Sequence, residues 1–503
     1  MNPLTWLLSK VTGLPEPTLR LLVTIILGYP VANLYNKRFN SEDAPASTKE
    51  ERNTFILTAG LGLNFFFNMT SIYHTLITVG LSYAICSFFQ HNRKLAAAGV
   101  WGLNATYLMT GYFFMQTDEY DITWTMTQCI LCLRMMAFGF DFYDGEKKVK
   151  VAGPPSQTDL KEEVDVTKAA IRPTEQRKPP AALPLSFGID TPLMELPSFV
   201  EVLAFANFPS AFLVGPQFSF SLYNKWLNTL PSSFDFQERD ERERARSAYV
   251  IRCAVLAVVY LGLQQTIGAT YSTSYLLTEE YRSHGFIARC VLFAIAGKFA
   301  YNKYIGIWLL TEGATASFGI SYEGFDKEGF ALYGGLANAL PATYETATSI
   351  DHIISAFNIN TNLWSKYYVF KRLKFLGNKQ ASQAGTLAFL ALWHGYHPMY
   401  FITFLLEYLY VQCEMVLRKR LSPMVRPYTN KNPIAWYGWK VVSWITCQLC
   451  VTYAVVGFEL LNFGKALQAY KSVWFLGHLI IPVILVGNNF LPRVKSTANK
   501  KTQ

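Results

Sequence analysis

The sequence predicts an all-α polytopic membrane protein with about eleven transmembrane or re-entrant helices. Two observations support this fold class. Of the 503 residues, 51% are hydrophobic, and they gather in runs long enough to cross a bilayer, for which roughly 20 residues suffice. Connectors rich in Lys and Arg separate many of these runs, as in membrane proteins with basic cytosolic loops. We therefore expect a single membrane domain over residues 1–503.

The apolar runs give the predicted spans in chain order. They cover about 19–36, 54–69, 71–90, 96–115, 123–142, 196–220, 247–270, 286–311, 384–411, 434–462 and 472–491. The run at 196–220 contains Pro197, Pro209 and Pro216. Because prolines interrupt helices, we interpret this run as a broken or re-entrant segment that lines a cavity. The charged segment Asp235–Arg246 is predicted to form an exposed surface helix.

Polar segments predict the orientation and the location of the protein. Basic loops follow the first, third and fifth runs and place those loops in the cytosol, with the N-terminus in the lumen. The segment 145–186 has little apolar content and is predicted to be a disordered cytosolic insertion. The predicted cytosolic tail, 492–503, contains Lys500 and Lys501, which match a dilysine retrieval signal. We therefore expect a multi-pass protein of the endoplasmic reticulum membrane with a cytosolic C-terminus.

Two other classes of site are not predicted. The net charge of +10 does not indicate nucleic-acid binding, because the basic residues lie between apolar runs and form no single basic face. The Cys-x-x-Cys pairs at Cys129 and Cys132 and at Cys447 and Cys450 have the spacing of zinc ligands. Both pairs lie in apolar segments, where four thiolates are costly to bury, so we expect no metal site.

The stretch from Phe357 to Glu407 holds the candidate active-site residues. It begins with Phe357-Asn-Ile-Asn-Thr-Asn-Leu-Trp364 and later contains Trp393-His394-Gly395. His394 lies near the middle of the predicted 384–411 span. An ionisable side chain at that depth is costly unless it faces a cavity or a partner, which favours a functional role. A core histidine bonded to a neighbouring helix is the alternative.

These motifs resemble those of the membrane-bound O-acyltransferase family, and most of all its lysophosphatidylcholine acyltransferase branch. The resemblance extends over most of the chain. It includes Phe212–Ser219, Tyr275–Tyr281, Gly297–Phe299, Trp308–Gly313, Phe370–Lys379 and Phe475–His478. Where the family tends to have Gly-Tyr, this chain has Met399-Tyr400 after Pro398. We therefore expect the helix to bend differently just beyond the histidine.

The resemblance implies transfer of a fatty acyl chain from acyl-CoA to a lysophospholipid, with lysophosphatidylcholine as the expected acceptor and its free hydroxyl, at sn-2, as the acylated group. It implies that the helices surround an internal reaction chamber. It also implies His394 as the general base and Asn358 as its partner. Acyl transfer needs a base, stabilisation of the oxyanion and exclusion of water, and a buried neutral histidine suits the first task. The Asn358 amide donates to the oxyanion or orients the hydroxyl or the imidazole, and the sequence does not decide which. Acyl-CoA is a co-substrate, and no bound cofactor is expected.

The connector Ser365–Gln380 mixes aromatic and basic residues, which predicts an interfacial helix. Its basic side chains are candidates for binding the phosphates of coenzyme A, and anchoring at the membrane interface is the alternative. These candidates are Lys366, Lys371, Arg372 and Lys374.

Other polar residues in or near the apolar runs are interpreted as structural. His397 stands three positions after His394, so the two are predicted to share a helix face. Buried charges are expected to be paired or to face a cavity, and none of those found here is predicted to be catalytic. They are Lys298, Lys303, Glu312 and Glu407. No Gly-x-Ser-x-Gly motif is present, which favours direct transfer without a serine acyl-enzyme.

Two alternative functions remain open at this point. One is an acyltransferase of the same family with a sterol, a diacylglycerol or a protein as acceptor. The other is a non-enzymatic transporter, which inverted repeats between the two halves would favour, and none is evident in the sequence. A homodimer is a further possibility that the sequence does not decide.

Overall fold

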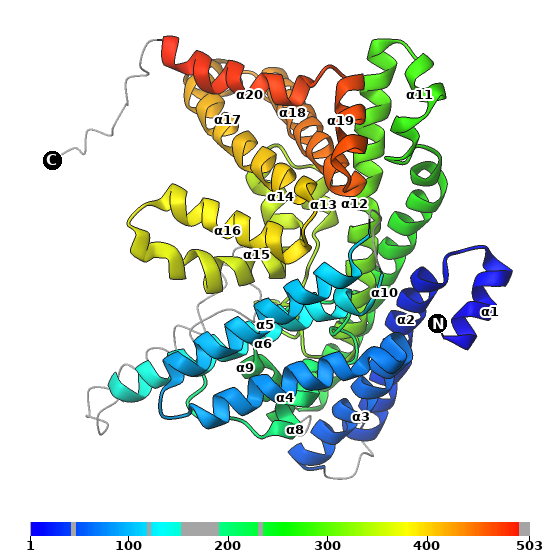
Figure 1. The fold of residues 1–503 in the computed structure, drawn as a ribbon, viewed down its shortest axis with the longest axis vertical. Helices are drawn as coiled ribbons and strands as arrows, with labels where there is room; N and C mark the ends of the chain where they lie inside the picture. Colours follow the sequence, from blue (N-terminus) through cyan, green and yellow to red (C-terminus); the bar gives the residue numbers. More distant parts are fainter. Residues whose placement is uncertain (1, 42–46, 118–121, 152–190, 230–234, 492–503) are drawn as a thin grey trace. The chain divides into compact units, whose positions relative to one another are not determined.

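The computed structural model describes residues 2–41, 47–117, 122–151, 191–229 and 235–491 (Figure 1). The predicted tail, 492–503, and most of the predicted insertion, 145–186, lie outside these residues. The described chain is helical almost throughout. Its sheet has two antiparallel strands, β1 (Gly324–Phe325) and β2 (Ala331–Leu332). The predicted all-α class is therefore confirmed.

The chain divides into two compact units. Unit 1 consists of residues 1–261, 304–340 and 357–396, and unit 2 of residues 262–303, 341–356 and 397–503. The helix α12 (Phe286–Ser317) contributes to both. The other helices of unit 1 are α1 (Pro3–Thr12), α2 (Glu16–Phe39), α3 (Lys49–Asn68), η1 (Met69–Ile72), α4 (Tyr73–Phe88), α5 (Arg93–Met115), α6 (Trp124–Val151), α8 (Phe199–Ala206), α9 (Phe220–Asn228), most of α10 (Phe236–Leu263), α15 (Ile359–Ser365), η7 (Lys366–Phe370), η8 (Arg372–Leu376) and α16 (Lys379–His394).

Unit 2 contains the C-terminal helices and several short connecting ones. They are η5 (Gln264–Gly268), η6 (Tyr275–Leu277), α11 (Glu279–Ser283), α13 (Pro341–Glu345), α14 (Ile350–Ala356), α17 (Pro398–Thr429), α18 (Pro433–Leu460), α19 (Phe463–Ser472), α20 (Leu476–Gly487) and η9 (Asn488–Phe490). In this unit Lys298 pairs with Glu345 at 2.6 Å and Lys303 with Glu459 at 2.5 Å. The predicted pairing of the two lysines is confirmed.

Several helices have the length and hydropathy of membrane spans. Within the described chain five helical stretches pass this test, or six if the bent pair α19 and α20 forms one span. They are Glu16–Phe39, Lys49–Phe88, Phe236–Gly268, Pro398–Thr429 and Pro433–Leu460. The predicted number of eleven is not confirmed.

Three predicted segments differ from the structure. The charged segment Asp235–Arg246 is helical from Phe236 and is not buried, as predicted, but the helix does not end with it, because α10 continues into the next apolar run. The connector Ser365–Gln380 is not one helix, because η7 and η8 are followed by a left-handed glycine at Gly377. The run 384–411 is not one span: α16 ends at His394 and α17 starts at Pro398.

The broken segment predicted at 196–220 is confirmed. A buried arginine stabilises its non-helical backbone inside the protein. After α8 the chain is no longer helical, so its buried backbone carbonyls need hydrogen-bond donors from outside the helix. The guanidinium of Arg134, on α6, donates to the carbonyls of Phe205, Ala206 and Ala211 at 3.0–3.2 Å. It also lies 5.0 Å from the Phe218 ring centroid. A buried polar backbone is stable only when it is hydrogen-bonded in this way.

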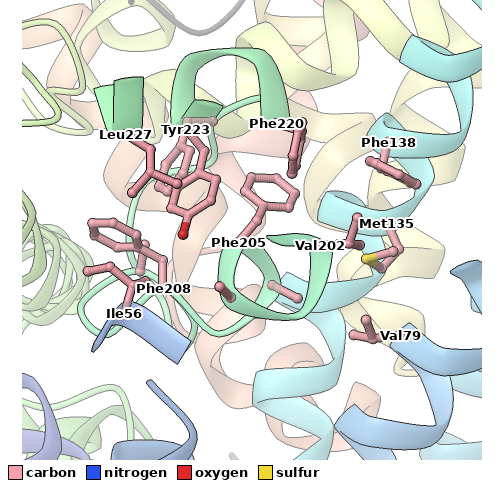
Figure 2. Close-up of a cluster of buried hydrophobic side chains, with 14 of the residues drawn as sticks. Ile56, Val79, Met135, Phe138, Val202, Phe205, Phe208, Phe220, Tyr223 and Leu227 are labelled. Atoms are coloured by element: carbon pink, nitrogen blue, oxygen red, sulfur yellow. The ribbon is translucent and has the colours of Figure 1, made fainter. Parts of the chain in front are cut away.

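Aromatic side chains from the same region fill the core of unit 1 (Figure 2). Phe205 of α8 and Phe220 of α9 meet edge to face at 5.5 Å. Tyr223 is fully buried, and its hydroxyl donates to the Asn53 side chain at 2.7 Å. Figure 2 shows Phe205 and Phe220 between Tyr223 and the α6 residues Met135 and Phe138. The core thus packs the broken segment between α3 and α6.

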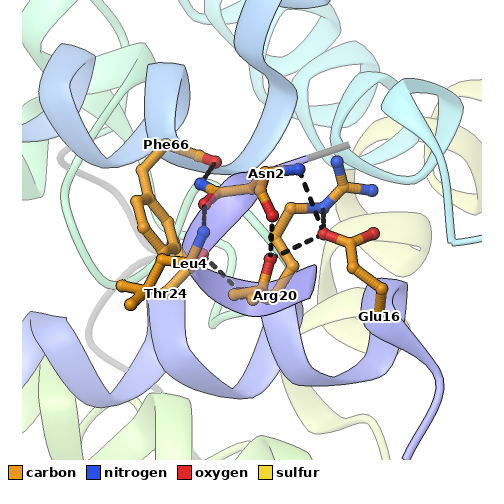
Figure 3. Close-up of polar contacts among 7 residues, drawn as sticks. Asn2, Leu4, Glu16, Arg20, Thr24 and Phe66 are labelled. Carbon is orange, nitrogen blue, oxygen red and sulfur yellow. Dashed lines mark hydrogen bonds and ion pairs between the residues drawn. The ribbon is translucent and has the colours of Figure 1, made fainter. Parts of the chain in front are cut away.

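The N-terminus of the described chain is attached to two helices by polar contacts (Figure 3). Asn2 caps α1 through Leu4, and its amide donates to the Phe66 carbonyl of α3 at 3.0 Å. Glu16 of α2 accepts from the Thr5 hydroxyl at 2.6 Å. Helix α1 is therefore joined to both α2 and α3.

Candidate functional site

His394 lies at the end of a helix. It is the last residue of α16, and Gly395 follows with φ +128°, a conformation that other residues rarely adopt. Pro398 then begins α17. The prediction that His394 lies inside a continuous 384–411 helix is therefore wrong, because this glycine ends the helix there. The half-buried imidazole packs edge to face on the neighbouring Trp393 ring at 4.6 Å.

Residues on either side of His394 are fixed to α5 and α6. The indole N–H of Trp393 donates to the Cys129 carbonyl on α6 at 2.9 Å. The Trp393 carbonyl accepts from the Tyr112 hydroxyl on α5 at 2.9 Å. Just beyond the break, the Tyr396 backbone N–H donates to the Gln116 side chain at 2.8 Å. The backbone that carries the histidine is thus held on both sides.

Asn358 immediately precedes α15 in a left-handed conformation, with φ 49° and ψ 45°. Asparagine tolerates this conformation better than most residues. Its carbonyl accepts from the Asn362 backbone N–H at 3.0 Å, but its side chain does not cap the helix. The residue is half-buried, and its side-chain amide makes no hydrogen bond to any residue in the described ranges. It is therefore available to bind a substrate.

The backbone next to Asn358 is held by Asn338. The Ile359 N–H donates to the Asn338 carbonyl at 3.1 Å. The Asn360 N–H and side-chain amide both donate to the Asn338 side-chain oxygen, at 3.1 and 3.2 Å. Asn360 is fully buried. The Asn360 side chain thus has a structural task, which distinguishes it from Asn358 two positions earlier.

Helices α15 and α16 are both attached to α6. The Trp364 indole of α15 donates to the Leu133 carbonyl at 2.9 Å, as the Trp393 indole of α16 does to the Cys129 carbonyl. Cys129 and Leu133 are one helical turn apart and lie on one face of α6. The Trp364 ring also stacks on Phe389 of α16 at 5.7 Å. The structure thus brings together the two helices that carry His394 and Asn358.

The second histidine occupies a different position from the predicted one. Residues 395–397 are not helical, and His397 immediately precedes α17 with extended backbone. The prediction that His394 and His397 share a helix face is therefore wrong. His397 is 8% exposed, and its ring packs on Tyr400 at 5.6 Å. It belongs to unit 2, and His394 to unit 1.

The four basic candidates lie on η7 and η8. Lys366, Lys371 and Lys374 are exposed, and the Lys371 ammonium lies 3.6 Å from the Tyr367 ring centroid. The half-buried Arg372 forms an ion pair with Asp144 of α6. Three of the four candidates thus present their charge to solvent, and the fourth connects η8 to α6. Binding to coenzyme A stays a prediction.

Sequence reasoning missed Asn338, which holds the backbone beside Asn358, and Arg134, which holds the broken segment. Asn338 has no motif around it, and its role depends on contacts with residues distant in the chain. Arg134 lies within an apolar run. A single arginine in such a run indicates a buried polar contact, and this signal could have identified it. Trp364 and Trp393 were part of the motifs, and their indole N–H groups required partners when buried.

Residues 109–455 match the membrane-bound O-acyltransferase family. The chain is 34% identical over 474 residues to lysophospholipid acyltransferase 5 of Drosophila melanogaster, which covers 92% of this chain and 85% of that protein. It is 32% identical over 491 residues to lysophospholipid acyltransferase 5 of Homo sapiens, with 95% and 90% covered. The lysophospholipid acyltransferase of Saccharomyces cerevisiae is 24% identical over 505 residues, with 95% and 76% covered.

Proposed function

The chain belongs to the membrane-bound O-acyltransferase family and is a multi-pass membrane acyltransferase, and we propose that it transfers a fatty acyl chain from acyl-CoA to a lysophospholipid. The relatives named as lysophospholipid acyltransferases support this class of acceptor. We further propose lysophosphatidylcholine as the preferred acceptor, the free sn-2 hydroxyl as the acylated group, and the endoplasmic reticulum as the location.

One observation carries the proposed mechanism. The His394 imidazole ends α16, and the Asn358 side-chain amide, which has no hydrogen-bond partner among the described residues, immediately precedes α15. Both helices are attached to the same face of α6. A base and a hydrogen-bond donor fixed in this manner are what acyl transfer to a hydroxyl requires. Because both side chains are half-buried, a bound substrate would exclude water from them.

In the proposed reaction the His394 imidazole accepts the proton of the lysophospholipid hydroxyl. The hydroxyl oxygen attacks the thioester carbonyl, and the amide N–H of Asn358 donates to the resulting oxyanion. The carbon–sulfur bond then breaks, and the leaving thiolate takes the proton from the imidazolium. The products are the diacyl phospholipid and free coenzyme A. We propose that Lys366, Lys371 and Lys374 attract the coenzyme A phosphates.

The test is an assay of the purified protein with radiolabelled acyl-CoA and a panel of acceptors. The panel contains lysophospholipids with different headgroups, a sterol and a diacylglycerol. We expect labelled phospholipid with the lysophospholipids, and the highest rate with lysophosphatidylcholine. Labelling of the sterol or the diacylglycerol alone would exclude the proposed acceptor class, and a higher rate with another headgroup would exclude only the choline preference.

A further inference from the structure

A buried carboxylate on α12 has no task in the proposed reaction. Glu312 is 2% exposed, and no Lys or Arg within the described ranges forms an ion pair with it. Its Oε1 accepts from the Tyr249 hydroxyl and from the Cys253 thiol, and its Oε2 accepts from the Asn338 backbone N–H at 2.9 Å. Arg252 of α10 attracts this carboxylate electrostatically but forms no ion pair with it. Burying a carboxylate without a directly paired cation is a costly way to stabilise a fold, which favours a functional reason for it.

Two successive sets of hydrogen bonds connect Glu312 to the backbone next to Asn358. Asn338, held by the carboxylate, accepts in turn from the backbone N–H groups of Ile359 and Asn360. These are the two residues that follow Asn358. On its other side, Phe357 pairs with Ala339 in an isolated β-bridge. Asn338 and Ala339 thus hold the backbone on both sides of Asn358.

We propose that Glu312 is a positioning residue that acts through Asn338 and orients the Asn358 amide toward the reacting carbonyl. The proposal rests on the role of Asn358 in the proposed function. The Glu312 side chain is buried, and its Oε1 is held by Tyr249 and Cys253, so its Oε2 is a fixed acceptor for the Asn338 backbone N–H. Asn358 is left-handed and makes no side-chain bond of its own to a described residue, so its direction depends on the backbone around it.

The test compares purified variants for kcat, for KM toward both substrates and for thermal stability. Glu312→Ala should lower kcat by about 10- to 100-fold with little change in KM, since a misplacement of about 1 Å costs about 10²-fold. Glu312→Gln keeps an oxygen acceptor for Asn338 and should recover most of the turnover. Tyr249→Phe is the matched control, because it removes a hydrogen bond to the same carboxylate but leaves the one to Asn338. Its kcat should stay close to that of the wild type.

A double variant separates positioning from general damage. In the Asn358→Ala background, Glu312→Ala should cause no further loss of kcat, because the group that it positions is gone. A further 10-fold loss there would overturn the proposal, and so would a wild-type kcat in Glu312→Ala or an equal loss in Glu312→Gln. If Glu312→Ala does not fold, Asn338→Ala tests the second step of the connection. It removes the side-chain oxygen that accepts from Asn360 but keeps the backbone N–H bond to Glu312, so kcat should again fall by about 10-fold or more, and wild-type turnover in Asn338→Ala would overturn the proposal. Full turnover of Asn358→Ala would instead refute the role of Asn358, and the positioning proposal with it.

Discussion

Removing the His394 imidazole is expected to lower turnover by about 10²–10⁴-fold, the usual cost of losing a general base. The variant is His394→Ala, measured as acyl transfer to lysophosphatidylcholine with purified, monodisperse protein. His397→Ala is the matched control, because that histidine packs on Tyr400 before a different helix and should affect turnover less. If His394→Ala keeps more than about a tenth of the wild-type turnover, another group is the base.

The Asn358 amide is expected to contribute about 10²–10³-fold as an oxyanion donor. Asn358→Ala should lose this factor in kcat but only about 1–2 kcal/mol of stability, which is the cost of an alanine in the left-handed conformation, since the side-chain amide makes no bond to a described residue. Asn360→Ala should show the opposite pattern. Its side chain donates to Asn338 and to the carbonyls of Leu336 and Ala337, so its loss destabilises the fold. Equal loss of stability in both variants would contradict the assignment.

Among the elements, the end of α16 depends on one glycine. Gly395→Ala should lower both stability and turnover, because a non-glycine residue at φ +128° is strained by about 1–3 kcal/mol and the helix end that carries His394 would shift. Gly438→Ala is a suitable control. Gly438 lies within α18, where an added Cβ meets no atom within 4 Å. Thermal unfolding and turnover are measured together, and normal turnover in Gly395→Ala would mean that the break does not position the histidine.

Hydropathy predicted most long helices well, because each buries apolar residues in a continuous run. The runs at 96–115 and 434–462 correspond to α5 and α18. Hydropathy failed at Gly395, since an apolar run does not reveal a positive φ. The signal was nevertheless present, as a glycine followed by Pro398 is a strong indication of a helix end and a new start. A contact such as that of Glu312 with Asn338 left no local pattern at all.

For the whole molecule, the loop charges predict that the C-terminal tail and the segment 145–186 both face the cytosol. Protease added to sealed microsomes should therefore remove an epitope tag placed at either position. A tag placed after Asp118, in an acidic connector, should resist the protease until detergent opens the membrane. A protected C-terminal tag would overturn the predicted orientation.

The end of α16 has an electrostatic consequence for the proposed reaction. The peptide dipoles of a helix leave partial negative charge on its last carbonyls, and His394 is the last residue of this helix. When the imidazole takes up the hydroxyl proton, the new positive charge forms beside that negative end. A cation at such a place gains typically about 0.3–1 kcal/mol, and about 2 kcal/mol in partly buried geometries. A histidine in the middle of a continuous span would lack this stabilisation. The break after His394 therefore gives the proposed base a field that favours its protonated intermediate.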